Sequence, residues 1–210
     1  MRYLLIHASI TLFVIIDPVG VAPLFAALTE GRSAEERRRA AWIGVLVAAL
    51  VLYVFALVGR AFLSALGVSI AAFRVAGGVL LFLVAIDMVF ARQSGLRSTT
   101  RTEDDEAHHR ADISVFPLAI PLIAGPGAIA SVMLLMGEAG SWSGRGIILA
   151  VLTIVLALTY LLLRMAPRLV RLLGVTGTNV VGRVLGIILA AIAAQFIIDG
   201  IREVLGGIHA

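Results

Sequence analysis

The chain has 210 residues, of which 60% are hydrophobic, and its mean hydropathy is +1.06. The apolar residues come in blocks long enough to cross a bilayer, which predicts an integral membrane protein rather than a soluble domain. The absence of cysteine excludes disulfides, thiolate metal sites and thiol nucleophiles. All 17 basic residues are arginines in predicted loops or at their flanks, so they indicate membrane topology and not nucleic-acid binding.

Six apolar segments predict an all-α membrane protein with six transmembrane helices. Three spans fill a first repeat, residues 1–90, and three fill a second, residues 113–210. Between them lies a charged connector, residues 91–112, with almost no large apolar residues, so we expect a flexible cytoplasmic loop. The expected spans cover residues 4–28, 41–63, 70–90, 113–136, 146–165 and 180–205.

The first span is interrupted by the sequence IDPVGVAPLF, residues 16–25. Pro18 removes a backbone donor and its ring collides with the preceding turn, while Asp17 is biased away from helical torsions. Gly20 and Pro23 loosen the next turn. The break should fall about 21 Å along the helix, near the middle of a hydrocarbon core of about 30 Å.

The fourth span has a matching interruption, AGPGAIASVM, at residues 124–133. Other features also match between the halves. LGVS at residues 66–69 corresponds to LGVT at 173–176, and Arg74 and Arg183 open similar stretches. Chance similarity among apolar segments is the alternative to duplication. Because each half has an odd number of spans, duplication predicts an inverted repeat with helices one and four broken at mid-membrane.

Arginine distribution predicts the orientation. The links after spans one, three and five, with their flanks, hold twelve arginines, and the opposite side holds five. Since arginine is enriched on the cytoplasmic side, both termini should lie outside the cytoplasm. Arg74 and Arg183 are interpreted as interfacial anchors at the ends of their spans.

The two broken segments resemble those of the MarC family of integral membrane proteins, also described as small neutral amino acid transporters. The similarity rests on DPVGVAPLF at residues 17–25 and FPLAIPLIAGPGAIA at residues 116–130. It implies six spans, an inverted repeat, and movement of glycine- or alanine-like amino acids across a bacterial or archaeal cytoplasmic membrane. Val21 departs from the family, which often has asparagine there, and removes an amide near the break.

Each break creates a half-helix N-terminus with free N–H groups and positive dipole character, which suits the carboxylate of an amino acid. Glycine lets a ligand approach the backbone, and small residues leave space. Packing kinks are the alternative role for the prolines, and Pro117 and Pro121 are expected to bend the approach. The predicted substrate-binding residues are Asp17, Pro18, Gly20, Ala22, Gly125, Pro126, Gly127, Ala128 and Ser131.

Asp17 has three candidate roles. Aspartate is a favoured N-cap and proline a favoured first helical residue, so Asp17-Pro18 predicts the start of a half-helix. The carboxylate could also hold the ammonium of a zwitterionic substrate, or carry a coupling proton. The second half has Gly125 at the equivalent place, so break geometry alone does not demand a charge.

A secondary transporter is the leading hypothesis, with a small amino acid, membrane lipids and a possible coupling ion, proton or sodium, as partners. A channel or a lipid-handling membrane protein is the alternative. An intramembrane enzyme is less favoured, because the sequence has no buried Ser–His pairing and no HExxH motif. No Walker motif, cofactor or metal site is predicted, and the oligomeric state is left open.

Overall fold

The computed structural model describes residues 2–90 and 113–208, so the predicted connector at 91–112 lies outside the described residues. The described chain is helical. Its elements are α1 (Arg2–Ile16), α2 (Pro18–Leu28), α3 (Ala34–Ala65), α4 (Ile70–Phe90), the π-helical segment η1 (Ser114–Ile123), α6 (Pro126–Glu138) and α7 (Trp142–Ile208).

Helix α7 and the pair formed by η1 and α6 are not straight, continuous spans. Gly174 has φ 63° and interrupts α7, dividing it into a first leg, Trp142–Leu172, and a second leg, Asn179–Leu205. The segment η1 and α6 meet at 55° across a short break. Within the described residues, five helices are long and apolar enough to cross a membrane, or six if this bent pair forms one span. The six predicted spans are therefore consistent with the helices observed.

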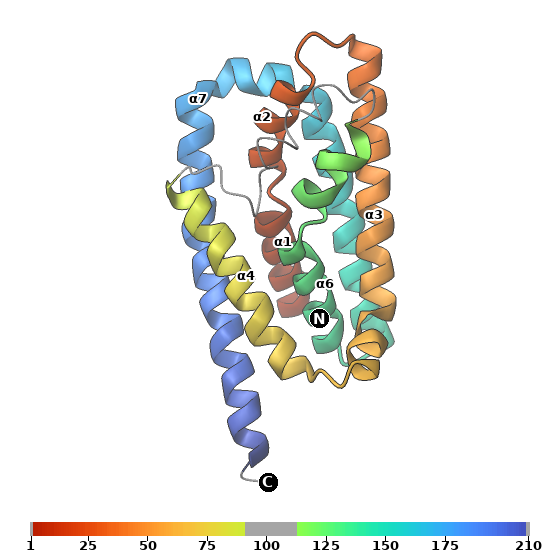
Figure 1. Ribbon diagram of the computed structural model, residues 1–210, viewed down its shortest axis with the longest axis vertical. Coiled ribbons are helices and arrows are strands. Elements are labelled where there is room, and N and C mark those ends of the chain that lie inside the picture. Colours follow the sequence, from red (N-terminus) through yellow and green to blue (C-terminus); the bar gives the residue numbers. More distant parts are fainter. Residues whose placement is uncertain (1, 91–112, 209–210) are drawn as a thin grey trace.

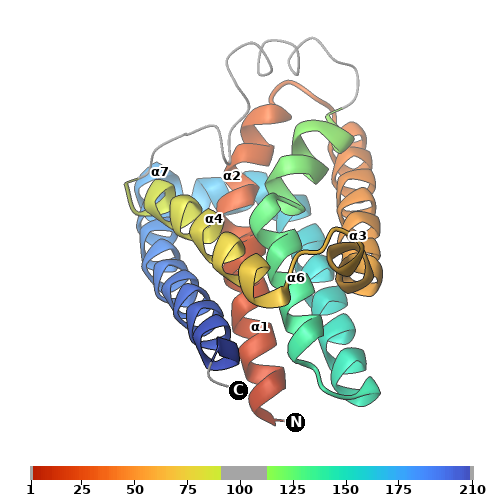
Figure 2. The ribbon, with the colours of Figure 1, turned by 60° about the horizontal axis from the view of Figure 1, so that its bottom comes forward.

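The two interrupted segments lie inside the bundle (Figures 1 and 2). The α3 helix and the first leg of α7 flank them on one side, and α4 and the second leg of α7 flank them on the other. Burial follows this arrangement, because 56% of the most apolar window of Arg2–Leu28 is buried, against 28% for α4. Large apolar side chains such as Leu50, Leu57 and Ile154 face outward, as lipid contact requires.

The two interrupted segments run in opposite directions along the bundle. The path from α1 to α2 rises from the end where the N-terminus lies, and the path from η1 to α6 descends toward that same end (Figure 1). The starts of α2 and α6 therefore both lie in the middle of the bundle.

Close contacts between α4 and the second leg of α7 fix one wall of the bundle. A Cβ atom at Gly78 would lie 2.9 Å from the carbonyl oxygen of Ala193, and one at Gly186 would lie 2.8 Å from the Cβ of Met88. Such backbone approach requires small residues, and it is the usual basis of helix association in lipid.

Candidate functional site

The first break is centred on Asp17, which separates α1 from α2. Its torsions, φ 48° and ψ 63°, are left-handed, and no other non-glycine residue in the described part of the chain has positive φ. That conformation costs about 1–2 kcal/mol for most side chains, and aspartate adopts it more readily than most. The Oδ1 atom accepts a hydrogen bond of 3.0 Å from the Gly20 N–H, so the predicted N-cap is confirmed.

Gly20 is explained by this cap. A Cβ atom built there would lie 2.1 Å from the Asp17 Oδ2 atom, so any side chain would displace the carboxylate. Asp17 is only 1% exposed, and Pro18 and Ala22 are also buried. A direct contact between substrate and this group of residues stays a prediction.

The second break has a different chemistry. Gly125 is extended, with φ −72° and ψ 168°, and no side chain caps the start of α6. Glycine is required because a Cβ atom would lie 2.6 Å from the carbonyl oxygen of Pro121. The first N–H groups of α6, on Gly127 and Ala128, lack the side-chain acceptor that Asp17 provides for α2, so this end keeps its positive dipole character.

The approach to the second break is bent, as predicted. Phe116 and Ile120 have non-helical torsions, and the peptide bonds before Pro117 and Pro121 are cis. Pro117 and Pro121 interrupt the hydrogen bonding of this π-helical segment, because proline has no backbone N–H to donate. Pro121 does more than bend the chain, since its carbonyl lies against Gly125.

A cavity of about 20 Å³ adjoins the second break, which is room for about one water molecule. Four predicted residues line it, namely Gly125, Pro126, Gly127 and Ala128. The other five predicted residues do not line this cavity, namely Asp17, Pro18, Gly20, Ala22 and Ser131.

Sequence reasoning missed Ile15, Leu81, Val84, Pro121, Leu122 and Ile123, which also line the cavity. The two breaks are neighbours across this cavity, because the position of a Cβ atom on Gly127 is 4.0 Å from Cγ2 of Ile15.

Two buried hydroxyl groups lie near the breaks. The Oγ atom of Ser131 and the Oγ1 atom of Thr11 are fully buried and have no hydrogen-bond partner among the described residues. Ser131 follows Gly127 by one helical turn and shares its face of α6. An unpaired buried hydroxyl costs about 1–3 kcal/mol, so the Ser131 hydroxyl is a candidate polar contact beside the start of α6.

Arg74 joins three helices at the end of the bundle where α6 ends. Its guanidinium is 3.0 Å from Glu138 Oε1 on α6 and 3.1 Å from Glu203 Oε2 on α7. The Arg74 side chain is only 15% exposed. The interpretation of Arg74 as an interfacial anchor stays a prediction, and the structure adds that carboxylates from two neighbouring helices converge on it.

Helices of this length and apolarity, with one sharply bent pair inside the bundle, define a multi-pass helical membrane protein. The model of the MarC family integral membrane proteins matches residues 3–205, and the chain belongs to this family. The resemblance predicted from the two broken segments is thereby confirmed.

The chain also resembles proteins from distant organisms. It is 37% identical over 205 residues to the UPF0056 membrane protein MJ1677 of Methanocaldococcus jannaschii, with 98% of each chain covered. It is 35% identical to UPF0056 membrane protein YvbG of Bacillus subtilis, over 94% of each chain. The UPF0056 membrane protein YhcE of Escherichia coli is also 35% identical, over 95% of this chain and 92% of that one. No solved structure matches.

Proposed function

We propose that the protein is a secondary transporter of small neutral amino acids, which bind as zwitterions between the two breaks. The observation that carries this proposal is the unequal chemistry of the breaks. The start of α6 offers uncapped N–H groups to a carboxylate, and Asp17 at the other break offers a carboxylate to an ammonium. The positive N-terminus of α6 and the negative Asp17 carboxylate, both in the middle of the bundle, suit a zwitterion that carries both charges.

The close packing around the cavity favours an amino acid substrate with a small side chain. Leu81 and Ile15 lie close to Gly127, and the cavity is too small for an amino acid in the conformation described. Substrate entry therefore requires helices or side chains to move, as in the alternating access of carriers. The buried Ser131 hydroxyl supplies one further polar group near the α6 start.

We also propose that the two halves form an inverted repeat. Matching residues recur at one constant spacing through both broken spans. The three pairs are Pro18 with Pro126, Ala22 with Ala130, and Glu30 with Glu138. The opposite directions of the two segments support the same relation (Figure 1).

The proposed inverted repeat suggests that the Arg74 ion pairs act as a gate that closes one end of the bundle. Arg74 matches Arg183, and Glu138 matches Glu30, so the repeat predicts a second arginine–glutamate pair at the opposite end. Arg183 and Glu30 are both exposed, and in the described part of the chain no ion pair joins them. We infer that the conformation described is closed at the Arg74 end, and that the alternate state closes Arg183 onto Glu30.

Arg74→Gln should slow amino acid exchange about three- to ten-fold, because it removes two partly exposed ion pairs that stabilise one end state. Arg145→Gln is the matched control, since Arg145 contacts the Trp142 ring at the same end and forms no ion pair within the described residues. Initial exchange rates in proteoliposomes measure the effect. Equal initial exchange rates in Arg74→Gln and Arg145→Gln would contradict the proposed gate.

The arginine bias supports an orientation with both termini outside the cytoplasm. The chain has no cysteine, so a single cysteine can report this. Thr176→Cys, near the kink in α7, should be protected from an impermeant thiol reagent in intact cells, and Ser64→Cys, at the end of α3, should react. Reaction of Thr176→Cys and protection of Ser64→Cys would indicate the opposite orientation.

Counterflow in proteoliposomes tests the function itself. Labelled alanine should accumulate transiently in vesicles preloaded with unlabelled alanine or glycine, and preloaded leucine should not drive it. A channel would equilibrate the label without accumulation, and a lipid-handling protein or an enzyme would give no exchange. Repeating the assay with imposed proton and sodium gradients identifies the coupling ion.

A further inference from the structure

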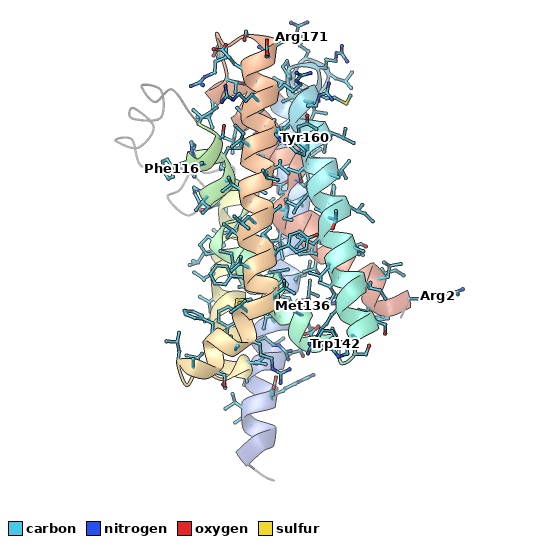
Figure 3. All side chains as sticks on the ribbon, turned by 90° about the vertical axis from the view of Figure 1, so that its right-hand side faces the viewer. Arg2, Phe116, Met136, Trp142, Tyr160 and Arg171 are labelled. Atoms are coloured by element: carbon cyan, nitrogen blue, oxygen red, sulfur yellow. The ribbon has the colours of Figure 1, made fainter. Side chains whose placement is uncertain are left out.

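A basic groove lies far from the breaks, between the first turns of α3 and the last turns of the first leg of α7. Two adjoining hollows, of about 500 Å³ and 530 Å³, share Arg37, Arg164 and Pro167 as lining residues. In Figure 3 this region lies at the upper end, where Arg171 is labelled above Tyr160. We define the basic groove by its five lining arginines, which are Arg37, Arg38, Arg164, Arg168 and Arg171.

Within the part of the chain that the structure describes, no ion pair joins an arginine of the basic groove to a carboxylate. Glu35 is the one acidic side chain among the described residues that lines the groove. Arg37 is held in place, because its Nη1 atom donates a 3.0 Å hydrogen bond to the carbonyl of Arg32. The groove therefore presents a concentrated positive charge with at least one guanidinium already positioned.

An aromatic tier lies one helical turn further into the bundle on both helices. Trp42 follows Arg38 by one turn on α3, and Tyr160 precedes Arg164 by one turn on α7. The rings of Trp42 and Tyr160 pack edge to face at 5.5 Å, and the Arg164 guanidinium lies 5.9 Å from the Tyr160 ring centroid. Trp42 is 54% exposed, which is typical of an aromatic residue at the level of lipid headgroups.

We propose that the basic groove is a binding site for an anionic phospholipid, with the phosphate on the arginines and the acyl chains along the aromatic tier. Guanidinium groups match phosphate oxygens with paired hydrogen bonds. Two features favour a lipid over free phosphate. The aromatic pair lies directly inward of the arginines, and exposed Leu46, one turn beyond Trp42 on α3, continues the apolar surface. General attraction of arginine to the membrane surface would not require this alignment.

Fluorescence of Trp42 tests the site without any transport measurement. The chain has two tryptophans, and Trp142 lies at the opposite end of the bundle, so Trp142→Phe leaves Trp42 as the reporter. The purified protein is placed in phosphatidylcholine vesicles that contain one tenth of a lipid with brominated acyl chains. The brominated lipid is either phosphatidylglycerol or phosphatidylcholine, and their quenching is compared at equal mole fraction.

Brominated phosphatidylglycerol should quench Trp42 more than brominated phosphatidylcholine, and the excess should vanish in Arg164→Gln/Arg168→Gln. Each arginine that contacts phosphate contributes about five-fold in local lipid enrichment. Arg39→Gln is the matched control, because Arg39 is exposed nearby and does not line the groove. It should keep the excess quenching.

Three results would overturn the proposal. One is equal quenching by the two lipids in the parent protein, which needs no variant. Another is an equal loss in Arg39→Gln and the double variant, which would indicate surface charge alone. The third is full displacement of the brominated phosphatidylglycerol by millimolar inorganic phosphate, which would indicate a free-phosphate site. None of these outcomes depends on the proposed transport function.

Discussion

A Gly127→Val variant should fold and reach the membrane but lose alanine binding. A Cβ atom at Gly127 would lie 2.7 Å from Cδ2 of Leu81, beside a cavity of about 20 Å³. The two γ-methyl groups of valine would fill the space next to the α6 start, where the substrate carboxylate is proposed to bind. Overpacking costs about 1–3 kcal/mol, and rotation of the flexible Leu81 side chain relieves part of it.

Gly137→Val provides the matched control on the same helix. A Cβ atom at Gly137 would meet only Ile70, at 3.9 Å, so binding should stay at the parental level. A second variant separates loss of the site from loss of the fold. Leu81→Ala combined with Gly127→Val returns volume to the cavity, so it should recover part of the alanine affinity.

Equilibrium binding of labelled alanine to purified, monodisperse protein is the measurement. Parental affinity in Gly127→Val would exclude the second break from the binding site. Failure of the double variant to bind better than Gly127→Val would indicate that the valine acts on backbone geometry and not on cavity volume.

The breaks could be predicted from sequence because their chemistry is local. Proline, aspartate and glycine act on the turn in which they occur, so Asp17-Pro18 and Gly125-Pro126 identify two helix starts without reference to the rest of the fold. The reason for each glycine was not predictable. Gly20 makes room for a carboxylate and Gly125 makes room for a carbonyl, and both contacts depend on three-dimensional geometry.

The cavity walls carry no sequence signal. Leu81 and Val84 lie in an apolar span where every third or fourth residue is similar, so only packing decides which of them faces Gly127. The Arg74 ion pairs are equally hidden. Glu138 ends α6 and Glu203 lies near the end of α7, so the two are far apart in the chain, and an arginine near a span end is usually a lipid anchor.

Replacement of Asp17 by asparagine should leave a folded protein that binds amino acid more weakly. Asparagine caps helices about as well as aspartate and also adopts the left-handed conformation found at this position. Stability should therefore change little, whereas Asp17→Ala should lower it by about 1 kcal/mol through loss of the hydrogen bond to the Gly20 N–H. This pair of variants separates the capping role from any role of the charge.

The charge is the property that asparagine removes. A carboxylate offers about four acceptor positions, so capping of Gly20 and contact with an ammonium are compatible. Hydrogen bonds to charged groups contribute about 1.5–3 kcal/mol, so Asp17→Asn should weaken alanine binding about ten- to hundred-fold. Binding to the purified variant measures this, with a melting curve to show that the fold is kept.

Transport assays on the same variant distinguish the two functional roles. If Asp17 holds the substrate ammonium, the Asp17→Asn variant binds alanine more weakly, and an imposed proton gradient still drives accumulation as in the parent. If Asp17 carries the coupling proton, exchange persists but accumulation driven by the proton gradient is lost, because asparagine cannot release a proton. Parental affinity together with a parental pH profile would leave Asp17 with the cap alone, and the substrate ammonium would then need another acceptor.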